Sequence, residues 1–191
     1  MNLTHLGDAL DHWKGSVIEL IGGKRVLVVP MFTDLDHWTH EDIETYARLL
    51  HLNPYNILKK GEGDLFSANT RGSYFCNLGK GDMFLDPDTG IAPDKTAEEK
   101  HVCPSEIACL LAESKSRILL IYQHASRDKD GVREKLKLLR STDSLEGCHV
   151  FAYDSGAASM VVISRNRERI DKARACLKSW LCGVASSRIV D

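Results

Sequence analysis

The sequence lacks the glycine-rich and nucleophile motifs that identify the commonest α/β enzymes. It has no G-x-G-x-x-G dinucleotide loop, no G-x-x-x-x-G-K-[ST] phosphate loop and no G-x-S-x-G nucleophile elbow. Gly22-Gly23 precedes a predicted strand instead of following one, so these glycines cannot hold a phosphate at a helix N-terminus. These absences disfavour a dinucleotide-dependent dehydrogenase, a P-loop NTPase and an α/β-hydrolase.

Closely spaced cysteines and long apolar runs are also missing. The six cysteines include no C-x-x-C pair, which excludes the ligand spacing of a zinc ribbon and of a thioredoxin site. No stretch approaches the roughly 18 unbroken apolar residues of a transmembrane helix. The first residues lack the basic start and apolar run of a signal peptide. We therefore expect a cytoplasmic protein with reduced thiols and no membrane partner.

The composition is that of an ordinary globular domain. Of the 191 residues, 43% are hydrophobic and 27% are charged, and the formal net charge is −2. No long-range positive field attracts nucleic acid, although this balance is compatible with a local basic patch. Because no repeat or linker divides the chain, we predict one domain over residues 1–191. The composition does not predict an oligomeric state.

Hydrophobic periodicity predicts helices that alternate with strands. The helices are expected near 6–21, 39–50, 105–113, 130–139 and 167–181. The strands are expected near 25–32, 74–78, 83–85, 117–123, 149–153 and 159–164. About five residues join the last two strands, which favours an antiparallel pair. The fold class is therefore α/β: one Rossmann-like, mostly parallel sheet with helices on both faces and an antiparallel pair at its C-terminal end.

Polar residues follow the predicted strands at the positions where open α/β sheets bind ligands. Ligands lie beyond the carboxyl ends of the strands in such sheets. The residues at these ends include Asp34, Asp86, His124 and Asp154. Each acid alone also suits a turn or a helix cap. Their coincidence at one edge of the sheet nevertheless predicts a functional site there.

The Asp86-Pro87-Asp88 segment is the sharpest local signal. Proline fixes its own φ and Gly90 permits a tight turn, so both carboxylates can be held near one point. Such a pair can bind a divalent ion, orient an amine or shift the pKa values needed for acid–base chemistry. The structural alternative is an ordinary Asp/Pro/Gly turn in which one aspartate caps the next segment.

A second cluster lies in the first predicted helix. Helical spacing places Asp8, Asp11 and His12 on one face, and Lys14 lies three residues after Asp11. The functional interpretation is a substrate-binding or phosphate-binding helix that covers the active edge of the sheet. The structural interpretation is a solvated face with a Lys–Asp pair.

These segments resemble a family of mostly uncharacterised bacterial proteins. Phe84-Leu-Asp-Pro-Asp-Thr-Gly-Ile91 matches its F-x-D-P-D-x-G-I motif, Tyr122-Gln-His124 matches its Y-Q-H motif, and Gly7-Asp-x-x-Asp-x-x-Lys14 matches its first helix. That family is similar to class I S-adenosylmethionine-dependent methyltransferases that modify adenine N6 of ribosomal RNA. Those enzymes begin with a G-N-x-x-D-x-x-K-H helix and carry a D-P-P-Y loop. The resemblance implies a methyltransferase-like fold.

The resemblance also implies roles for particular residues. Asp86 and Pro87 match the Asp and the first Pro of the catalytic loop, and Asp11 and Lys14 match the Asp and Lys of the first helix. Two positions of the loop differ, because an Asp and a Thr replace the second Pro and the aromatic residue that stacks on the target base. No acidic-x-Gly-x-Gly loop for S-adenosylmethionine follows Phe32.

From the residues and the resemblance together, we expect S-adenosylmethionine-dependent methylation of an amine in a nucleic acid or nucleotide. In such a reaction the enzyme mainly positions the methyl donor and the acceptor in line, so one well-held carboxylate can be enough for catalysis. The predicted catalytic residues are Asp86, Asp88 and His124. The predicted substrate-binding residues are Asp11, Lys14, Pro87 and Thr89, and Asp34 is the predicted cofactor-binding residue.

Two other functions use the same edge of the sheet. A metal-dependent phosphoesterase or nuclease would hold a divalent ion with Asp86, Asp88 and His124 and activate a water molecule. A non-catalytic relative with the methyltransferase fold would retain only a binding surface.

Overall fold

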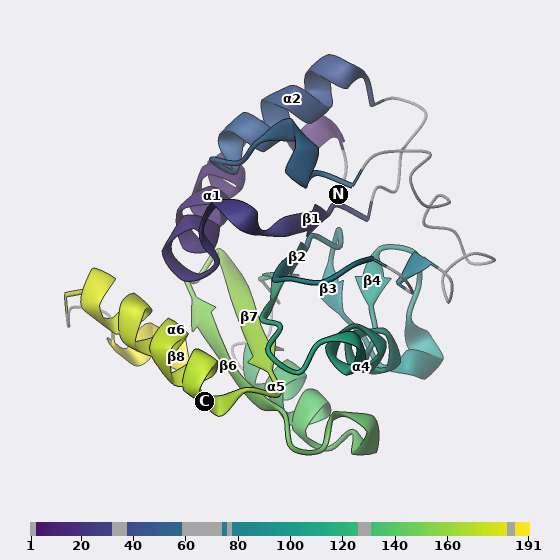
Figure 1. Ribbon diagram of the computed structural model, residues 1–191, viewed down its shortest axis with the longest axis vertical. Helices are drawn as coiled ribbons and strands as arrows, with labels where there is room; N and C mark the ends of the chain where they lie inside the picture. Colours follow the sequence, from purple (N-terminus) through teal and green to yellow (C-terminus); the bar gives the residue numbers. More distant parts are fainter. Residues whose placement is uncertain (1–2, 32–37, 59–73, 76–77, 126–130, 183–185) are drawn as a thin grey trace.

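The computed structural model describes residues 3–31, 38–58, 74–75, 78–125, 131–182 and 186–191 (Figure 1). The α-helices are α1 (Ala9–Ile21), α2 (His40–Leu49), α4 (Pro104–Glu113), α5 (Gly131–Arg140) and α6 (Arg167–Trp180). The strands are β1 (Leu27–Val29), β2 (Met83–Leu85), β3 (Gly90–Ile91), β4 (His101–Val102), β5 (Leu119–His124), β6 (His149–Asp154), β7 (Ala158–Ser164) and β8 (Ile189–Val190). Short 3-10 helices include η1 (Leu3–His5) and η6 (Asp143–Leu145).

Side-chain caps fix where the first two α-helices begin. Asp8 accepts a hydrogen bond from the backbone N–H of Leu10, so α1 begins at residue 9 and not at residue 6 as predicted. Thr39 and Asp42 form a reciprocal capping box at the start of α2. The cap of α1 fixes the start of the helix, whose first two turns carry the predicted binding residues Asp11 and Lys14.

The main sheet has six strands in the order β1-β2-β5-β7-β6-β8. The pairings β1–β2 and β2–β5 are parallel, whereas β5–β7, β7–β6 and β6–β8 are antiparallel. The predicted α/β class is confirmed, but the sheet is more evenly mixed than the predicted, mostly parallel one. The difference arises because β7 lies between β5 and β6, and because β8 adds an edge strand that the sequence pattern did not indicate.

Helices cover both faces of the sheet, as predicted (Figure 1). Successive strand residues point to opposite faces, so Phe84 and Leu120 pack with α1, α2 and α6, whereas Leu85 and Ile121 pack with α4 and α5. The near-continuous apolar runs of the central strands follow from this burial on both sides. Two apolar layers therefore hold the strands in place, and the carboxyl ends of the parallel strands β1, β2 and β5 lie at one edge of the sheet.

Three short strands were not predicted from the sequence, and one predicted strand is not found in the described residues. β3 and β4 form a separate parallel pair, and β3, β4 and β8 have two residues each, too few to show alternation. In the predicted strand at 74–78, the structure describes Tyr74, Phe75 and Leu78, and none of these lies in a strand.

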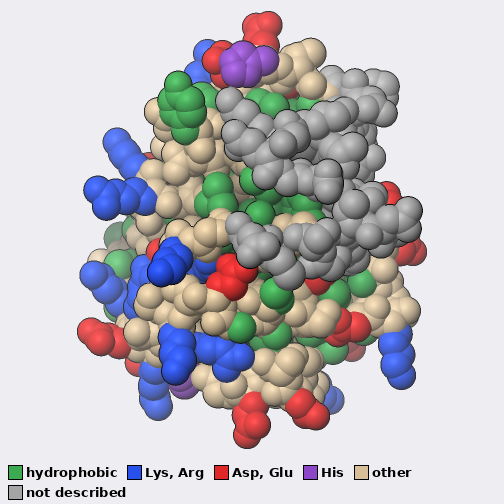
Figure 2. Space-filling view, turned by 45° about the vertical axis from the view of Figure 1, so that its right-hand side comes forward, with side chains coloured by type: hydrophobic (Ala, Val, Ile, Leu, Met, Phe, Trp, Pro, Cys, Tyr) green, Lys and Arg blue, Asp and Glu red, His purple; other side chains and the backbone are tan. Residues whose placement is uncertain are grey.

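Two further properties of the described residues concern their helices and their cysteines. No helix among them is both long and apolar enough to cross a membrane. Cys103, Cys109, Cys148, Cys176 and Cys182 form no disulfide bond with one another. In the view of Figure 2, most of the Lys and Arg side chains drawn in blue lie on the left side of the visible face.

Candidate functional site

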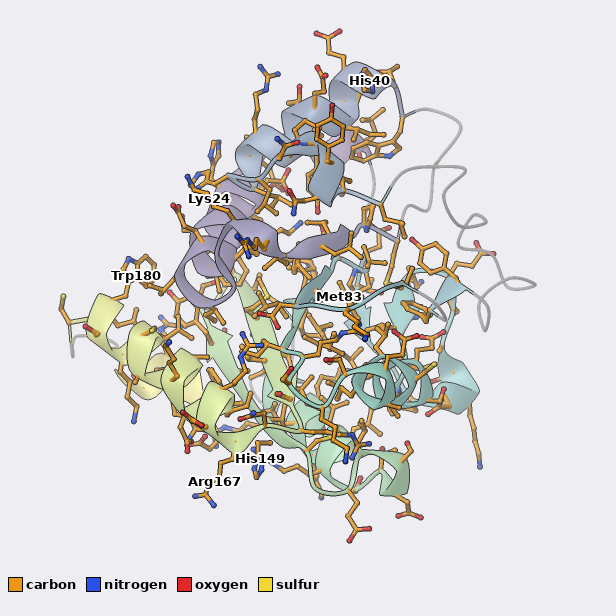
Figure 3. All side chains as sticks on the ribbon, in the orientation of Figure 1. Lys24, His40, Met83, His149, Arg167 and Trp180 are labelled. Atoms are coloured by element: carbon orange, nitrogen blue, oxygen red, sulfur yellow. The ribbon has the colours of Figure 1, made fainter. Side chains whose placement is uncertain are left out.

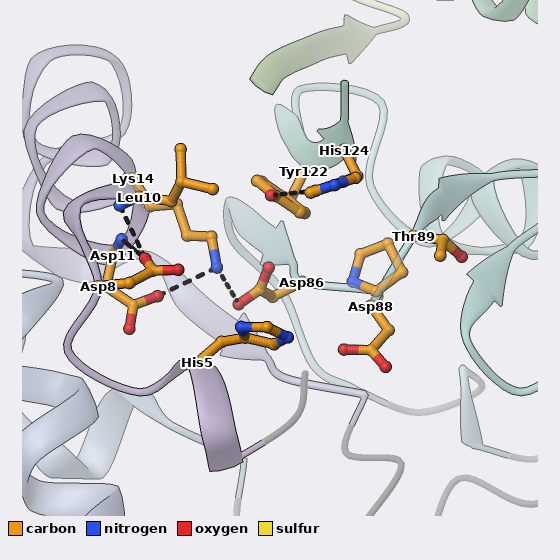
Figure 4. A pocket seen from close by; sticks show the side chains of 11 residues that line it. His5, Asp8, Leu10, Asp11, Lys14, Asp86, Asp88, Thr89, Tyr122 and His124 are labelled. Carbon is orange, nitrogen blue, oxygen red and sulfur yellow. Dashed lines mark hydrogen bonds and ion pairs between the residues drawn. The ribbon is translucent and has the colours of Figure 1, made fainter. Parts of the chain in front are cut away.

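A pocket of about 310 Å³ lies at the carboxyl ends of β2 and β5 (Figure 4). Its walls come from η1, the first two turns of α1, the segment after β2 and the end of β5. The lining residues are His5, Asp8, Leu10, Asp11, Lys14, Asp86, Pro87, Asp88, Thr89, Tyr122 and His124. Its position is the one that open α/β sheets use for ligands, and its size suits a small molecule.

A buried ion pair crosses this pocket. The Lys14 ammonium lies 3.1 Å from Asp11 Oδ1 and 3.0 Å from Asp86 Oδ2. The Lys14 side chain is 6% exposed and each carboxylate side chain 1% exposed. One lysine therefore joins the N-terminal helix to the segment after β2, across 72 residues of sequence.

Simple periodicity explains how these three side chains meet. Phe84 faces α1 and Leu85 faces away, so the next residue, Asp86, returns to the α1 side of the sheet. On α1, Asp11 and Lys14 are separated by about one helical turn and share its inner face. Strand and helix periods thus direct the carboxylate and the ammonium toward each other.

Two more groups hold the carboxylates. The Tyr46 hydroxyl, from the buried face of α2, donates a hydrogen bond to Asp86 Oδ2. The backbone N–H of Gly7 donates to Asp11 Oδ2 at 2.9 Å. Because the lysine and both carboxylates are held from several elements, the charges are fixed in place before any ligand arrives.

Burial and the neighbouring charges shift the pKa values of this network. Burial alone would lower the pKa of Lys14, but the negative charges of Asp86 and Asp11 outweigh it and raise that pKa above its ordinary value. Burial, followed by the charge of Asp86, raises the pKa of Tyr46 well above its ordinary value. Burial also raises the pKa of Asp11, against the effect of the Lys14 charge. Lys14 is therefore charged and Tyr46 neutral at neutral pH.

Tyr122 connects this network to His124. Lys14 Nζ lies 4.4 Å from the centre of the Tyr122 ring, within the range of a cation–π contact. The Tyr122 hydroxyl lies 3.1 Å from His124 Nδ1. Burial is the main cause that raises the pKa of Tyr122 to about 12. Because β-strand residues two apart share a face, Tyr122 and His124 both reach the pocket.

These shifts predict that the protein loses stability at alkaline pH. Lys14, Tyr46 and Tyr122 have ordinary pKa values of 10.5, 10.0 and 10.0, and all three pKa values are raised by folding. Above about pH 10 the unfolded chain releases these protons while the folded protein retains them. The free energy of unfolding should then fall by up to about 1.4 kcal/mol per pH unit for each group.

Denaturant unfolding from pH 8 to pH 12 would measure this loss. Tyr122→Phe should reduce its steepness above pH 10, because one of the three protons is then absent. Tyr55→Phe, at a side chain that is 88% exposed, should not change it. A free energy of unfolding that stays constant above pH 10 would contradict the described network.

Gln123 holds the segment after β2 against the end of β5. Its side-chain oxygen accepts a hydrogen bond from the backbone N–H of Ile91 at 2.8 Å, and its amide nitrogen donates to the Thr89 carbonyl at 3.0 Å. Gly90, which lies between Thr89 and Ile91, has φ +117°. A Cβ at this position would lie 2.3 Å from the side-chain oxygen of Gln123. The glycine is thus required both for its backbone conformation and for space.

The pocket brings together every predicted site residue except one. Asp11, Lys14, Asp86, Pro87, Asp88, Thr89 and His124 all line it, whereas Asp34 lies outside the described residues. The two carboxylates after β2 do not act as a pair: Asp86 points toward Lys14, and Asp88 points away from it (Figure 4). Asp8 caps α1, and Asp154 accepts hydrogen bonds within the β6–β7 turn.

Sequence reasoning missed several residues of the site. Tyr46 belongs to the apolar face of α2, where its spacing is typical of a core residue, so no local signal marks it. His5 reaches the pocket from η1, outside any predicted element. Tyr122 and Gln123 could have been found, because they belong to the same Y-Q-H motif as His124.

The described residues give no support to a metal centre. Among them, no group of three or more His, Cys, Asp or Glu side chains lies close enough together to hold a metal ion.

Comparisons with family models, with curated proteins and with solved structures found no match to the chain. The function is therefore inferred from the geometry of the pocket.

Proposed function

We propose that this pocket is the acceptor site of a cytoplasmic, S-adenosylmethionine-dependent methyltransferase that acts on an amine of a nucleic acid or nucleotide. The supporting observation is the contact between Lys14 and Asp86. These residues belong to the two segments that resemble the methyltransferase motifs. The two segments lie far apart in the sequence, and the fold joins them in one buried ion pair at a ligand-binding edge.

The charge of the pocket agrees with this proposal. Four carboxylates face it and only one lysine ammonium. They belong to Asp8, Asp11, Asp86 and Asp88, against Lys14. Such a lining attracts a positively charged group, and the sulfonium of S-adenosylmethionine is of that kind.

The chain's own residues would position the acceptor. S-adenosylmethionine supplies the electrophilic methyl group when it is bound. Asp86, immobilised by Lys14 and Tyr46, accepts a hydrogen bond from the acceptor amine and aligns its lone pair. In the tautomer whose Nδ1–H donates to the Tyr122 hydroxyl oxygen, His124 Nε2 carries the lone pair that would take up the proton released by the amine.

A metal-dependent phosphoesterase is a weaker proposal for this pocket. It would need Asp86, Asp88 and His124 to converge on one ion. Lys14 and Tyr46 already engage Asp86 Oδ2, and Asp88 points away from Lys14. This geometry favours a carboxylate that orients an amine over one that ligates a metal ion.

Thermal unfolding with S-adenosylmethionine tests the proposal directly. A ligand present at a hundred times its Kd should add about 2.7 kcal/mol to the free energy of unfolding and raise Tm by several degrees. Transfer of a labelled methyl group to RNA, DNA and free nucleotides would then identify the acceptor. Asp86→Asn should lower kcat/KM by about a hundredfold or more, because the acceptor is no longer aligned.

Asp143→Asn provides a matched control, because Asp143 is an exposed aspartate of η6 outside the pocket. It should leave both the Tm shift and the transfer rate unchanged. A Tm shift with Mg²⁺ or Mn²⁺ alone would favour the hydrolase instead. No shift with either ligand would leave only the non-catalytic alternative.

A further inference from the structure

A second pocket, of about 360 Å³, lies where α5, β6 and α6 meet. It is lined by Arg140, His149, Arg167 and Arg174, together with Asp171 and Asp191. Strands β5 and β6 run in the same direction, since both are antiparallel to β7. His149 begins β6, so this pocket opens toward the sheet edge opposite the candidate site, and Figure 3 shows His149 and Arg167 there, close together.

Helical spacing gathers the charged residues of α6 at this pocket. Arg167, Asp171 and Arg174 are separated by four and three residues, so they share one face of the helix. Arg140, the last residue of α5, is anchored by a hydrogen bond from its Nη2 to the Val150 carbonyl at 2.9 Å. Three guanidinium groups from two helices therefore surround one cavity.

Arg174 has one buried donor that the described residues leave without a hydrogen-bond partner. Its guanidinium lies over the Phe151 ring at 5.0 Å, and its Nη2 contacts Asp191 Oδ1 at 2.6 Å. Its Nε is buried and has no hydrogen-bond partner among the described residues. The Nε and Nη2 hydrogens of an arginine point from the same edge of the guanidinium. Asp191 engages only Nη2, whereas an anion with two oxygens on this edge would satisfy both donors.

The two carboxylates at this pocket are weakly held. Asp171 lies 3.6 Å from Arg167, and their side chains are 61% and 78% exposed. Asp191 is 67% exposed in its pair with Arg174. Exposed ion pairs contribute little free energy because water competes for both partners. A more highly charged anion can therefore displace both carboxylates from the arginines.

We propose that this pocket binds a phosphate group. Arginine matches the oxygens of phosphate through paired hydrogen bonds, and such a pair would use the buried Nε of Arg174 together with the Nη2 that now holds a carboxylate. The phosphate belongs either to a nucleic-acid backbone or to a small phosphorylated molecule. The proposal rests on this pocket alone and is independent of methyl transfer at the candidate site.

Calorimetric titration with inorganic phosphate and with a short single-stranded RNA tests the site. Arg174→Gln should weaken binding by about tenfold or more, because it removes both the Nε and the Nη2 donors of Arg174. Arg167→Gln should weaken binding several-fold, and Asp191→Asn should strengthen it, because the competing carboxylate is lost. Lys172→Gln removes one charge from an exposed position of α6 outside the pocket and should change the affinity less than twofold.

The two titrants distinguish the source of the phosphate. Tighter binding of RNA than of inorganic phosphate, with an affinity that falls as salt rises, supports a nucleic-acid backbone. Binding of inorganic phosphate with no gain for RNA supports a small phosphorylated ligand. Arg167→Gln and Asp191→Asn keep the test valid if Arg174→Gln fails to fold, since both side chains are mostly exposed. Binding of neither titrant, or binding that these variants leave unchanged, overturns the proposal.

Discussion

Replacement of Lys14 by methionine is expected to lower the free energy of unfolding by about 3–5 kcal/mol, roughly 6–20 °C in Tm. Methionine preserves much of the volume of lysine but not its charge. Asp11 and Asp86 would then remain buried near each other without a cation. A buried charge that has lost its partner is far more costly than an exposed one.

Urea unfolding of Lys14→Met would measure this loss, with Lys24→Met as the matched control. Lys24 is an exposed lysine, and its replacement should change the free energy of unfolding by no more than about 0.5 kcal/mol. Adding Asp86→Asn to Lys14→Met should recover part of the loss, because it removes one stranded carboxylate. Equal effects of the two single lysine replacements would show that the network does not stabilise the fold.

Replacement of Gly90 by alanine is expected to lower the free energy of unfolding by about 2–6 kcal/mol. The backbone at φ +117° strains any residue with a Cβ, and the new Cβ would lie 2.3 Å from the Gln123 side-chain oxygen. Gln123 must then move and give up its hydrogen bonds to Thr89 and Ile91. Because these bonds hold the segment that carries Asp86, ligand binding at the pocket should weaken as well.

Gly81→Ala separates the strain from the clash. Gly81 has φ +123°, almost the conformation of Gly90, but an added Cβ there meets nothing within 4 Å. Its replacement should cost only the strain, about 1–3 kcal/mol, and should leave the pocket intact. Thermal unfolding of both variants, with ligand titration at the pocket, would measure the difference. If the two replacements lower the free energy of unfolding equally, then contact with Gln123 is not the reason that residue 90 must be glycine.

Much of the candidate site was predictable because its residues carry local signals. Asp86 and His124 follow apolar runs, and the ends of such runs are where α/β sheets place ligands. Lys14 was identified from a motif in the first helix. Tyr46 carries no such signal, because a tyrosine on the apolar face of a helix looks the same whether it fills the core or holds a carboxylate. The buried Nε of Arg174 likewise has no signal in the sequence, because arginine is common on the surface of such a helix.

The sequence by itself determined the helices and most strands, the α/β class and the residues at the strand ends. Each of these depends on periods of 2 and 3.6 residues or on nearby turn residues, which any short window contains. Only the tertiary structure decided that Lys14 meets Asp86 across 72 residues, that β7 lies between β5 and β6, and that Asp86 and Asp88 point apart. Such contacts depend on which strands pair and which face each helix covers, and these are set by the packing of the whole chain.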